Sequence, residues 1–353
     1  MYGCRPLLCR SCPGLIVDTM IERLKVEGFK SIEKQEFTFA PLTIVTGLNS
    51  TGKSSLLQAI AYIVRYSSDT TGKLLSDIVS PFEVVRNKYQ NSEQVRIRLT
   101  KDEEDLSLKI SREFSSYFGR EKWLDYERNI YYLTANRIGP ENLVTIFEDK
   151  VCGLNGEALF GTYDNEKSEA LREALIMDDV SFTLESQVNY WLRYILDLPV
   201  EISSERVNTQ TAQIFYKSDG IPNIQPRQLG AGVSYLAKIL ILCLRAKEGD
   251  VVMIENPEIH LHPAAQSRLA EFLAFMIKSR VQLIVETHCE NVLNRLRYEV
   301  FSENIRPEDI VIFYKQKITT PFLRIGVKSN GQYDREFPEG FFDATLDALI
   351  LID

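Results

Sequence analysis

The chain has 353 residues, of which 44% are hydrophobic and 25% are charged, and it carries a formal net charge of −8. This composition is that of a globular protein, and the acidic balance argues against nucleic-acid binding over the whole surface, although it leaves room for a local basic groove. No apolar run approaches the roughly 18 residues of a membrane helix, so direct membrane insertion is not expected.

The first 19 residues differ in composition from the rest. Three cysteines crowd this segment: Cys4, Cys9 and Cys12. It lacks the apolar core and the cleavage site of a secretory signal, so we expect residues 1–19 to be a disordered leader or an upstream extension. A zinc site here would need a fourth ligand, which is absent nearby. The other cysteines are isolated: Cys152, Cys243 and Cys289. Isolated cysteines are typical of the reducing cytoplasm.

Short strand-like segments at 22–30 and 35–39 precede an apolar strand at 42–46, a glycine-bounded loop and an apolar-periodic helix. This order is that of a phosphate-binding P-loop. Its glycines permit backbone angles that a Cβ resists, so successive N–H groups turn toward the β-phosphate. Lys53 would reach the β- and γ-phosphates of ATP, and Ser54 would place its hydroxyl on Mg²⁺. The other expected loop contacts are Gly47, Asn49, Ser50, Thr51, Gly52 and Ser55.

Residues 67–226 lack the pattern of a second complete α/β unit. Strand-like segments lie at 94–100, 106–111 and 130–133, and a mainly helical segment lies at 166–198. We interpret this range as an inserted subdomain between two parts of an ATPase head, 20–66 and 227–353. No heptad seam runs through it, so a long coiled coil is not expected.

A second motif is Val251-Val-Met-Ile-Glu255-Asn256-Pro257-Glu258-Ile-His260-Leu-His262-Pro. Its apolar start predicts a buried strand that ends in an acid beside the P-loop. A carboxylate there can hold Mg²⁺ or its water, so Glu255 is the expected metal-side carboxylate, together with Ser54. The alternative is a strand that ends in solvated acids.

A third motif, at 281–289, is again a buried strand that delivers polar residues at its carboxyl end, where open α/β sheets bind ligands. His288 could hydrogen-bond the γ-phosphate or its attacking water. The three histidines of the chain all lie in these two motifs: His260, His262 and His288. Two alternatives stay open, a packing role for His260 and a zinc site that includes Cys289, although histidines two apart on a strand point oppositely.

A fourth motif, Gly230-Ala-Gly232-Val-Ser234, precedes the acidic strand and begins an apolar helix. Glycines and a serine at a helix start make an anion site. Because the P-loop already cradles its own phosphates, this site would serve a nucleotide bound by another subunit. The alternative is an ordinary glycine-rich helix start.

The order of these motifs resembles the ABC-type ATPase heads, the group that includes structural-maintenance-of-chromosomes (SMC) proteins, RecF-like repair proteins and overcoming-lysogenization-defect (OLD) nucleases. Phe29-Lys30-Ser31, the P-loop, Glu-Asn-Pro-Glu-Ile-His-Leu-His-Pro and Glu-Thr-His look most like small bacterial AAA ATPases of OLD-like and antiphage-defence systems. The resemblance implies an α/β fold, an ABC-type P-loop ATPase head with a mixed β and helical insertion.

The resemblance also implies a homodimer, or a higher homo-oligomer, in which two heads sandwich two ATP molecules. Residues 230–234 of one head would face the γ-phosphate held by Lys53 and Ser54 of the other. His288 would be the switch histidine. Lys30 and Ser31 match a position that assists the phosphates or the adenine.

The chain departs from the ABC pattern after the metal-binding acid, where Asn256 stands in place of a catalytic glutamate. An amide cannot accept a proton as a general base. Either Glu258 positions the attacking water, or hydrolysis is slow and ATP binding is itself the signal. We expect slow turnover.

Three functions fit these motifs. The first is an ATPase that regulates a separate effector, such as a nuclease or a toxin, in antiphage defence, because the segment after His288 is too short for the nuclease domain of OLD proteins. The second is an ATP-dependent DNA-binding clamp in DNA repair or maintenance, with basic residues Arg96, Arg98, Arg120 and Lys122. The third, a transport ATPase subunit, fits poorly because the Glu-Asn-Pro-Glu motif looks unlike transporter heads.

Overall fold

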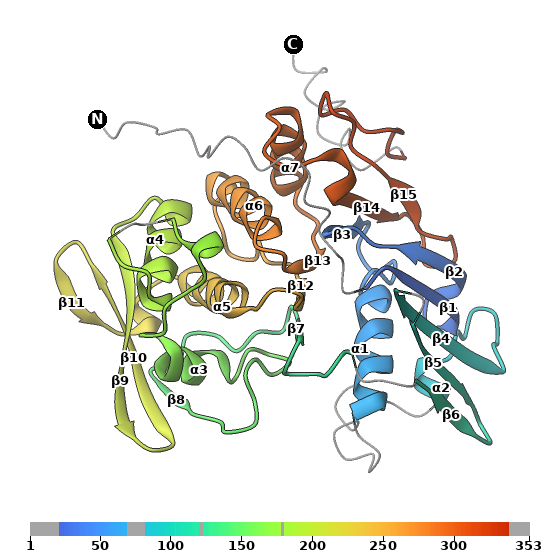
Figure 1. The fold of residues 1–353 in the computed structure, drawn as a ribbon, viewed down its shortest axis with the longest axis horizontal. Helices are drawn as coiled ribbons and strands as arrows, with labels where there is room; N and C mark the ends of the chain where they lie inside the picture. Colours follow the sequence, from blue (N-terminus) through green and yellow to red (C-terminus); the bar gives the residue numbers. More distant parts are fainter. Residues whose placement is uncertain (1–20, 69–81, 103, 120–122, 178–179, 339–353) are drawn as a thin grey trace.

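The computed structural model describes residues 21–68, 82–102, 104–119, 123–177 and 180–338 (Figure 1). The leader expected at 1–19 lies outside these residues. Among the residues that are described, no helix has the length and apolar composition needed to cross a membrane.

A six-stranded sheet with the order β15-β14-β3-β13-β12-β7 forms the centre. Its strands are β3 (Leu42–Gly47), β7 (Ile130–Leu133), β12 (Val251–Glu255), β13 (Gln282–Glu286), β14 (Ile310–Lys315) and β15 (Leu323–Ile325). All neighbours are parallel except β14 and β15. Parallel strands are covered on both faces, and β3, β7, β12, β13 and β14 are accordingly buried at every residue.

The two faces of this sheet pack against different layers (Figure 1). Successive residues of a strand point to opposite faces. In β12, Val252 and Ile254 join an apolar cluster to which three of the neighbouring helices contribute, whereas Val251 and Met253 join the cluster built with α1 (Ser54–Ser68). The three helices are α5 (Ala231–Arg245), α6 (Pro263–Ile277) and α7 (Glu290–Phe301).

An antiparallel sheet with the order β2-β1-β4-β5-β6 lies on the α1 side. Its strands are β1 (Arg23–Phe29), β2 (Ile32–Thr38), β4 (Gln94–Lys101), β5 (Glu104–Ser111) and β6 (Ser115–Phe118), and the short helix α2 (Phe82–Val85) precedes β4. Buried and accessible residues alternate in β4 and β5, as expected when one face of a sheet packs on a core and the other meets water.

A third unit packs beside α5 and α6. It contains the strands β8 (Leu143–Thr145), β9 (Val200–Asn208), β10 (Thr211–Ser218) and β11 (Ile221–Ile224), and the helices α3 (Leu159–Glu166) and α4 (Leu184–Leu196). Short 3₁₀ helices lie at η1 (Glu173–Leu175), η2 (Pro226–Gln228) and η3 (Pro307–Asp309). Trp191 of α4 is buried, and its ring centroid lies 5.0 Å from that of Phe272 and 5.1 Å from that of Phe275 in α6, so this apolar contact joins the unit to the helices that cover the central sheet.

The range 67–226, expected as one inserted subdomain, contributes strands to all three sheets, and β7 pairs with β12 in the central one. The division of the chain at these boundaries stays a prediction. The helical segment expected at 166–198 is narrower in the structure, because α4 begins only after Thr183, whose side chain accepts a hydrogen bond from the backbone N–H of Ser186 at 3.3 Å.

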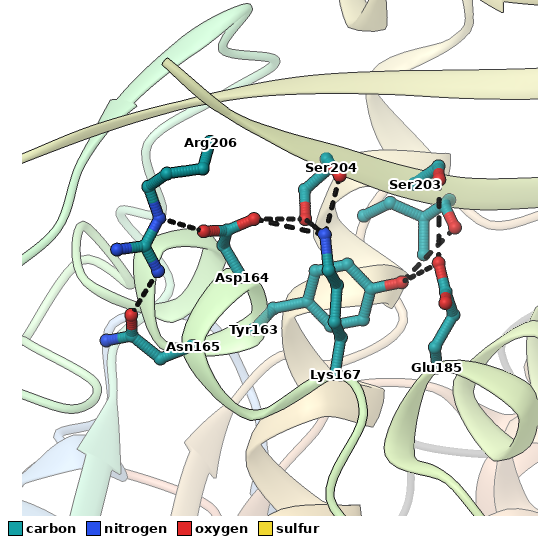
Figure 2. Close-up of polar contacts among 9 residues, drawn as sticks. Tyr163, Asp164, Asn165, Lys167, Glu185, Ser203, Ser204 and Arg206 are labelled. Carbon is teal, nitrogen blue, oxygen red and sulfur yellow. Dashed lines mark hydrogen bonds and ion pairs between the residues drawn. The ribbon is translucent and has the colours of Figure 1, made fainter. Parts of the chain in front are cut away.

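A cluster of polar side chains joins α3 to β9 (Figure 2). Asp164 of α3, whose side chain is 2% exposed, accepts hydrogen bonds from Ser204 Oγ at 2.7 Å, from Lys167 Nζ at 3.2 Å and from Arg206 Nε. Burial opposes ionisation of this carboxyl, but the hydrogen bonds from Ser204, Arg206 and Lys167 outweigh burial and lower the pKa of Asp164. The ionised carboxylate therefore helps to hold α3 on the sheet.

We expect the Asp164→Asn variant to have a free energy of unfolding about 1–3 kcal/mol lower than wild type at pH 7, because hydrogen bonds to a charged group are lost. The folded-state pKa is lowered, so this contribution is complete above the unfolded-state pKa of about 3.9 and disappears as the pH falls through the lower folded-state value. Urea unfolding between pH 3 and 7 should show the two proteins converging in acid. Asp219→Asn, in an exposed turn, is the matched control; equal losses in both variants would contradict the role of Asp164.

Candidate functional site

The P-loop runs from the end of β3 to the start of α1, at the carboxyl edge of the central sheet. Gly52 has a φ of +87°, and a Cβ there would lie 2.2 Å from Ser31 Oγ, so only glycine fits this position. Lys53 is buried and its Nζ donates a hydrogen bond to the carbonyl of Leu48. The loop is thus tightly turned, and its own backbone carbonyl at Leu48 accepts the hydrogen bond of the Lys53 side chain.

An open cavity of about 460 Å³ lies over this loop. Its lining comprises Lys30, Ser31, Ser50, Gly52, Lys53, Ser54, Ser55, Val84, Arg86, Lys88, Tyr89, Glu286, His288 and Ile318. Of the predicted residues, Lys30, Ser31, Ser50, residues 52–55 and His288 therefore line one cavity, whereas Gly47, Asn49 and Thr51 are not among its lining residues. Glu255, Glu258 and residues 230–234 are not among the described residues that line it.

Lys30 and Ser31 lie directly against the P-loop. Ser31 Oγ is 3.0 Å from the carbonyl oxygen of Gly52 and 3.0 Å from Ser55 Oγ, and Lys30 Nζ donates to Gln58 Oε1 at 2.6 Å. Burial lowers the pKa of Lys30, and the charge of Glu255 opposes that shift. The turn after β1 thus brings a second ammonium group to the cavity over the P-loop.

Two acidic residues lie side by side at the carboxyl ends of β12 and β13, where Glu255 and Glu286 are register partners in the parallel sheet. Tyr132 donates its hydroxyl hydrogen bond to Glu255 Oε1, and the N–H of Ala135 donates to Glu255 Oε2 at 3.0 Å. Burial and the charge of Glu255 raise the pKa of Glu286 to about 7, against the lowering effects of the Ser54 hydrogen bond and of Lys53. Glu286 was not among the predicted site residues, although it ends a buried strand just as Glu255 does.

Glu258 and His288 meet behind the P-loop. The backbone N–H of His288 donates to Glu258 Oε1 at 3.0 Å, and Glu258 Oε2 is buried with no hydrogen-bond partner in the part of the chain that the structure describes. Burial raises the pKa of Glu258. Burial and the charge of Lys53 lower the pKa of His288, so its imidazole is neutral at pH 7.

Arg137, in the loop after β7, holds the acidic motif in place. Its guanidinium donates to the backbone carbonyls of Glu255 and of Asn256, the latter at 3.1 Å. Asn256 has a φ of +43°, which is uncommon for a residue with a side chain, so this loop needs external support. Burial lowers the pKa of Arg137 to about 10. No sequence motif marked Arg137, because its partners are 118 and 119 residues away.

The fourth motif begins α5. Gly230 is exposed, and no heavy atom lies within 4 Å of where its Cβ would stand, whereas a Cβ on Gly232 would lie 2.5 Å from the carbonyl oxygen of His260. Ser234 differs from the expectation: it is 1% exposed and its Oγ is 3.3 Å from the hydroxyl of Tyr216. Its position one helical turn into α5 directs its side chain to the core of the chain.

The zinc alternative finds no support in the geometry. His260 stacks on Tyr235, His262 accepts a hydrogen bond at the start of α6, and Cys289 Sγ lies 3.1 Å from Gln266 Oε1. Within the described ranges, no three or more His, Cys, Asp or Glu side chains converge to hold a metal ion.

The residues around Ser54 fit a magnesium–nucleotide complex. Mg²⁺ prefers oxygen ligands and keeps several of its waters when it is bound with substrate phosphates. Ser54 supplies a hydroxyl, and Glu286 Oε2 is a buried carboxylate oxygen with no hydrogen-bond partner among the described residues. Lys30 and Lys53 add the positive charge that phosphates require.

Two family models match the chain. One, described as "AAA domain, putative AbiEii toxin, Type IV TA system", matches residues 91–294, and the other, described as "AAA ATPase domain", matches residues 20–150. A comparison with curated proteins found no match.

Solved structures of Smc heads are similar to the chain. One is an Smc head bound to the C-winged helix domain of ScpA, with 14% identity, a TM-score of 0.58, and coverage of 87% of this chain and 98% of that one. Another is an Smc head domain with an extended coiled coil bound to the C-terminal domain of ScpA derived from Pyrococcus furiosus, with 13% identity, a TM-score of 0.57, and coverage of 94% and 99%. These similarities confirm the predicted α/β fold of an ABC-type P-loop ATPase head.

Proposed function

Because this chain belongs to the family of AAA domains whose model matches residues 91–294, we propose that it is an ATPase whose heads pair around ATP and thereby regulate a separate effector protein. The observation that carries ATP binding is the cavity in which Lys53, Ser54 and His288 meet over the P-loop. Pairing of the two heads would then signal to the effector that ATP is bound.

In this proposal the chain's own residues bind and orient the triphosphate. The N–H groups of the P-loop and the start of α1 would face the β-phosphate, Lys53 would exchange the Leu48 carbonyl for the β- and γ-phosphates, and Ser54 would offer its hydroxyl to the metal. Bound Mg²⁺ would neutralise charge that develops on the transferred phosphoryl group. His288, being neutral, can hydrogen-bond the γ-phosphate or the attacking water.

Hydrolysis in this proposal is slow. The amide of Asn256 cannot accept a proton, and Glu258 is the carboxylate left in the acidic motif to position water. Glu258 Oε2 is buried and unpartnered among the described residues, which supports that role, but Glu258 does not line the cavity. A Glu258→Gln variant that turns over ATP as fast as wild type would remove this residue from the mechanism.

Pairing of two heads is supported by the open start of α5. Gly230 stands exposed at the N-terminus of a 15-residue helix, where backbone N–H groups favour an anion. A γ-phosphate held by the P-loop of a second head would be such an anion. Ser234 takes no part in this contact.

We expect ATP to convert the wild-type chain to a dimer, and Gly230→Glu to raise the dimer dissociation constant at least about tenfold, because juxtaposed like charges at an interface cost several kcal/mol. Gly230 has ordinary backbone angles and free space, so the variant should fold and bind ATP in its own P-loop. Light scattering after gel filtration, with and without ATP, measures the masses. Asn294→Glu, exposed on α7, is the charge-matched control.

The result that contradicts pairing is a wild-type chain that stays monomeric with ATP bound. Undiminished dimerisation of Gly230→Glu would instead remove α5 from the interface while leaving ATP-dependent pairing intact.

A separate effector in antiphage defence is supported by the family description, which names a toxin of a type IV toxin–antitoxin system, and by the Smc heads, which are solved in complex with another protein. An affinity pull-down from the native host, with and without ATP, tests this. A chain that stays solitary in both conditions and protects cells alone would contradict it.

The DNA clamp draws less support from the structure. Arg96 and Arg98 are each paired with a carboxylate, Glu27 at 3.4 Å and Asp105 at 3.7 Å, which reduces the positive potential of β4. Arg120 and Lys122 lie outside the described residues. Salt-dependent DNA binding that requires ATP, found in the same pull-down, would favour the clamp.

A further inference from the structure

Two carboxylates are candidates to hold the metal ion of a bound nucleotide. Glu255 and Glu286 pair level with each other on β12 and β13, and β13 is the strand that lies next to β3. Glu286 therefore lies on the strand adjacent to the P-loop strand β3, and Glu255 lies on the next strand beyond it.

Glu255 is already engaged within the fold. Its Oε1 accepts the hydroxyl hydrogen of Tyr132, its Oε2 accepts the N–H of Ala135, and its backbone carbonyl accepts from Arg137. All three donors belong to the β7 strand and the loop that follows it. These contacts fix that segment to the end of β12, so Glu255 has a structural role.

Glu286 has the opposite surroundings. It lines the cavity over the P-loop together with Ser54 and Lys53, and the charge of Lys53 acts on it. Its Oε2 is buried without a hydrogen-bond partner among the described residues. A buried carboxylate oxygen without a partner costs free energy, which a bound cation would offset.

We propose that Glu286, and not Glu255, is the carboxylate that holds Mg²⁺ together with Ser54, and that Glu255 is a positioning residue for the segment after β7. The inference rests on the proposed binding of ATP.

The test compares Glu286→Gln with Glu255→Gln in the full chain. Affinity for a fluorescent ATP analogue is measured in EDTA and in Mg²⁺, and binding of Mn²⁺ in the presence of ATP is followed by the electron paramagnetic resonance signal of the free ion. In wild type the metal should tighten nucleotide binding. Glu286→Gln should weaken Mn²⁺ binding by at least about 10- to 100-fold, the range found when residues that support metal ligands are substituted, and should lose the Mg²⁺ effect. Glu255→Gln should keep both.

The outcomes separate this inference from the proposed function. A wild-type chain that binds no ATP in EDTA or in Mg²⁺ contradicts the proposed function. A wild-type chain that binds ATP, with Glu286→Gln retaining the metal effect or Glu255→Gln losing it, overturns the assignment of Glu286 alone. Thermal unfolding without nucleotide shows whether each variant folds; should Glu286→Gln unfold, Glu286→Asp, which keeps the charge, is compared with Glu255→Gln by the same criteria.

Discussion

Replacing Lys53 by alanine is expected to weaken ATP binding by about 100-fold or more and to abolish hydrolysis. Hydrogen bonds to charged groups contribute about 1.5–3 kcal/mol each, and Lys53 would make such bonds to both the β- and the γ-phosphate. Nucleotide affinity from calorimetry and phosphate release from a coupled assay measure the two effects. ATP binding within threefold of wild type would contradict the P-loop assignment.

The loss of ATP affinity should come from missing contacts to the nucleotide and not from unfolding of the protein. In the structure, Lys53 Nζ contacts the carbonyl of Leu48, an exposed residue, so water can replace the ammonium group when the side chain is removed. The melting temperature without nucleotide should change little. Lys217→Ala, which removes an exposed lysine of β10 far from the P-loop in sequence and on another sheet, is the control for the loss of one positive charge.

Replacing Arg137 by alanine is expected to lower the free energy of unfolding by about 2–5 kcal/mol and to reduce ATP turnover. The change removes a buried cation and leaves the carbonyls of Glu255 and Asn256 without their donor, at about 1–3 kcal/mol for each unsatisfied group. The loop with Asn256 at positive φ would then lose the support that holds Glu258 near His288. Urea unfolding and phosphate release measure the two effects.

Two comparisons make this prediction specific. Arg137→Lys keeps the charge but cannot span two carbonyls with one planar group, so we expect an intermediate loss of stability. Arg227→Ala removes an exposed arginine and should change neither quantity. An Arg137→Ala protein as stable as wild type would show that water satisfies the two carbonyls.

Much of the fold was predictable because its central elements have strong local patterns. The strands at 42–46, 251–254 and 281–285 are mostly apolar, and each appears in the structure within one residue of its expected range. Parallel strands are buried on both faces, so their residues cannot alternate with polar ones and stand out in sequence. The inserted range was harder to interpret, because its strands pair with partners in three different sheets.

The sequence by itself determined the chemistry at the strand ends: a P-loop with Lys53 and Ser54, an acidic motif and a histidine motif, all at the carboxyl edge of one sheet. Only the tertiary structure decided which of these side chains face the cavity. Strand order placed Glu286 next to the P-loop strand and Glu255 one strand farther away, and it joined Arg137 to the acidic motif. Helix phase turned Ser234 inward. Local patterns specify what a segment forms, whereas the neighbours of a side chain depend on how distant segments pack together.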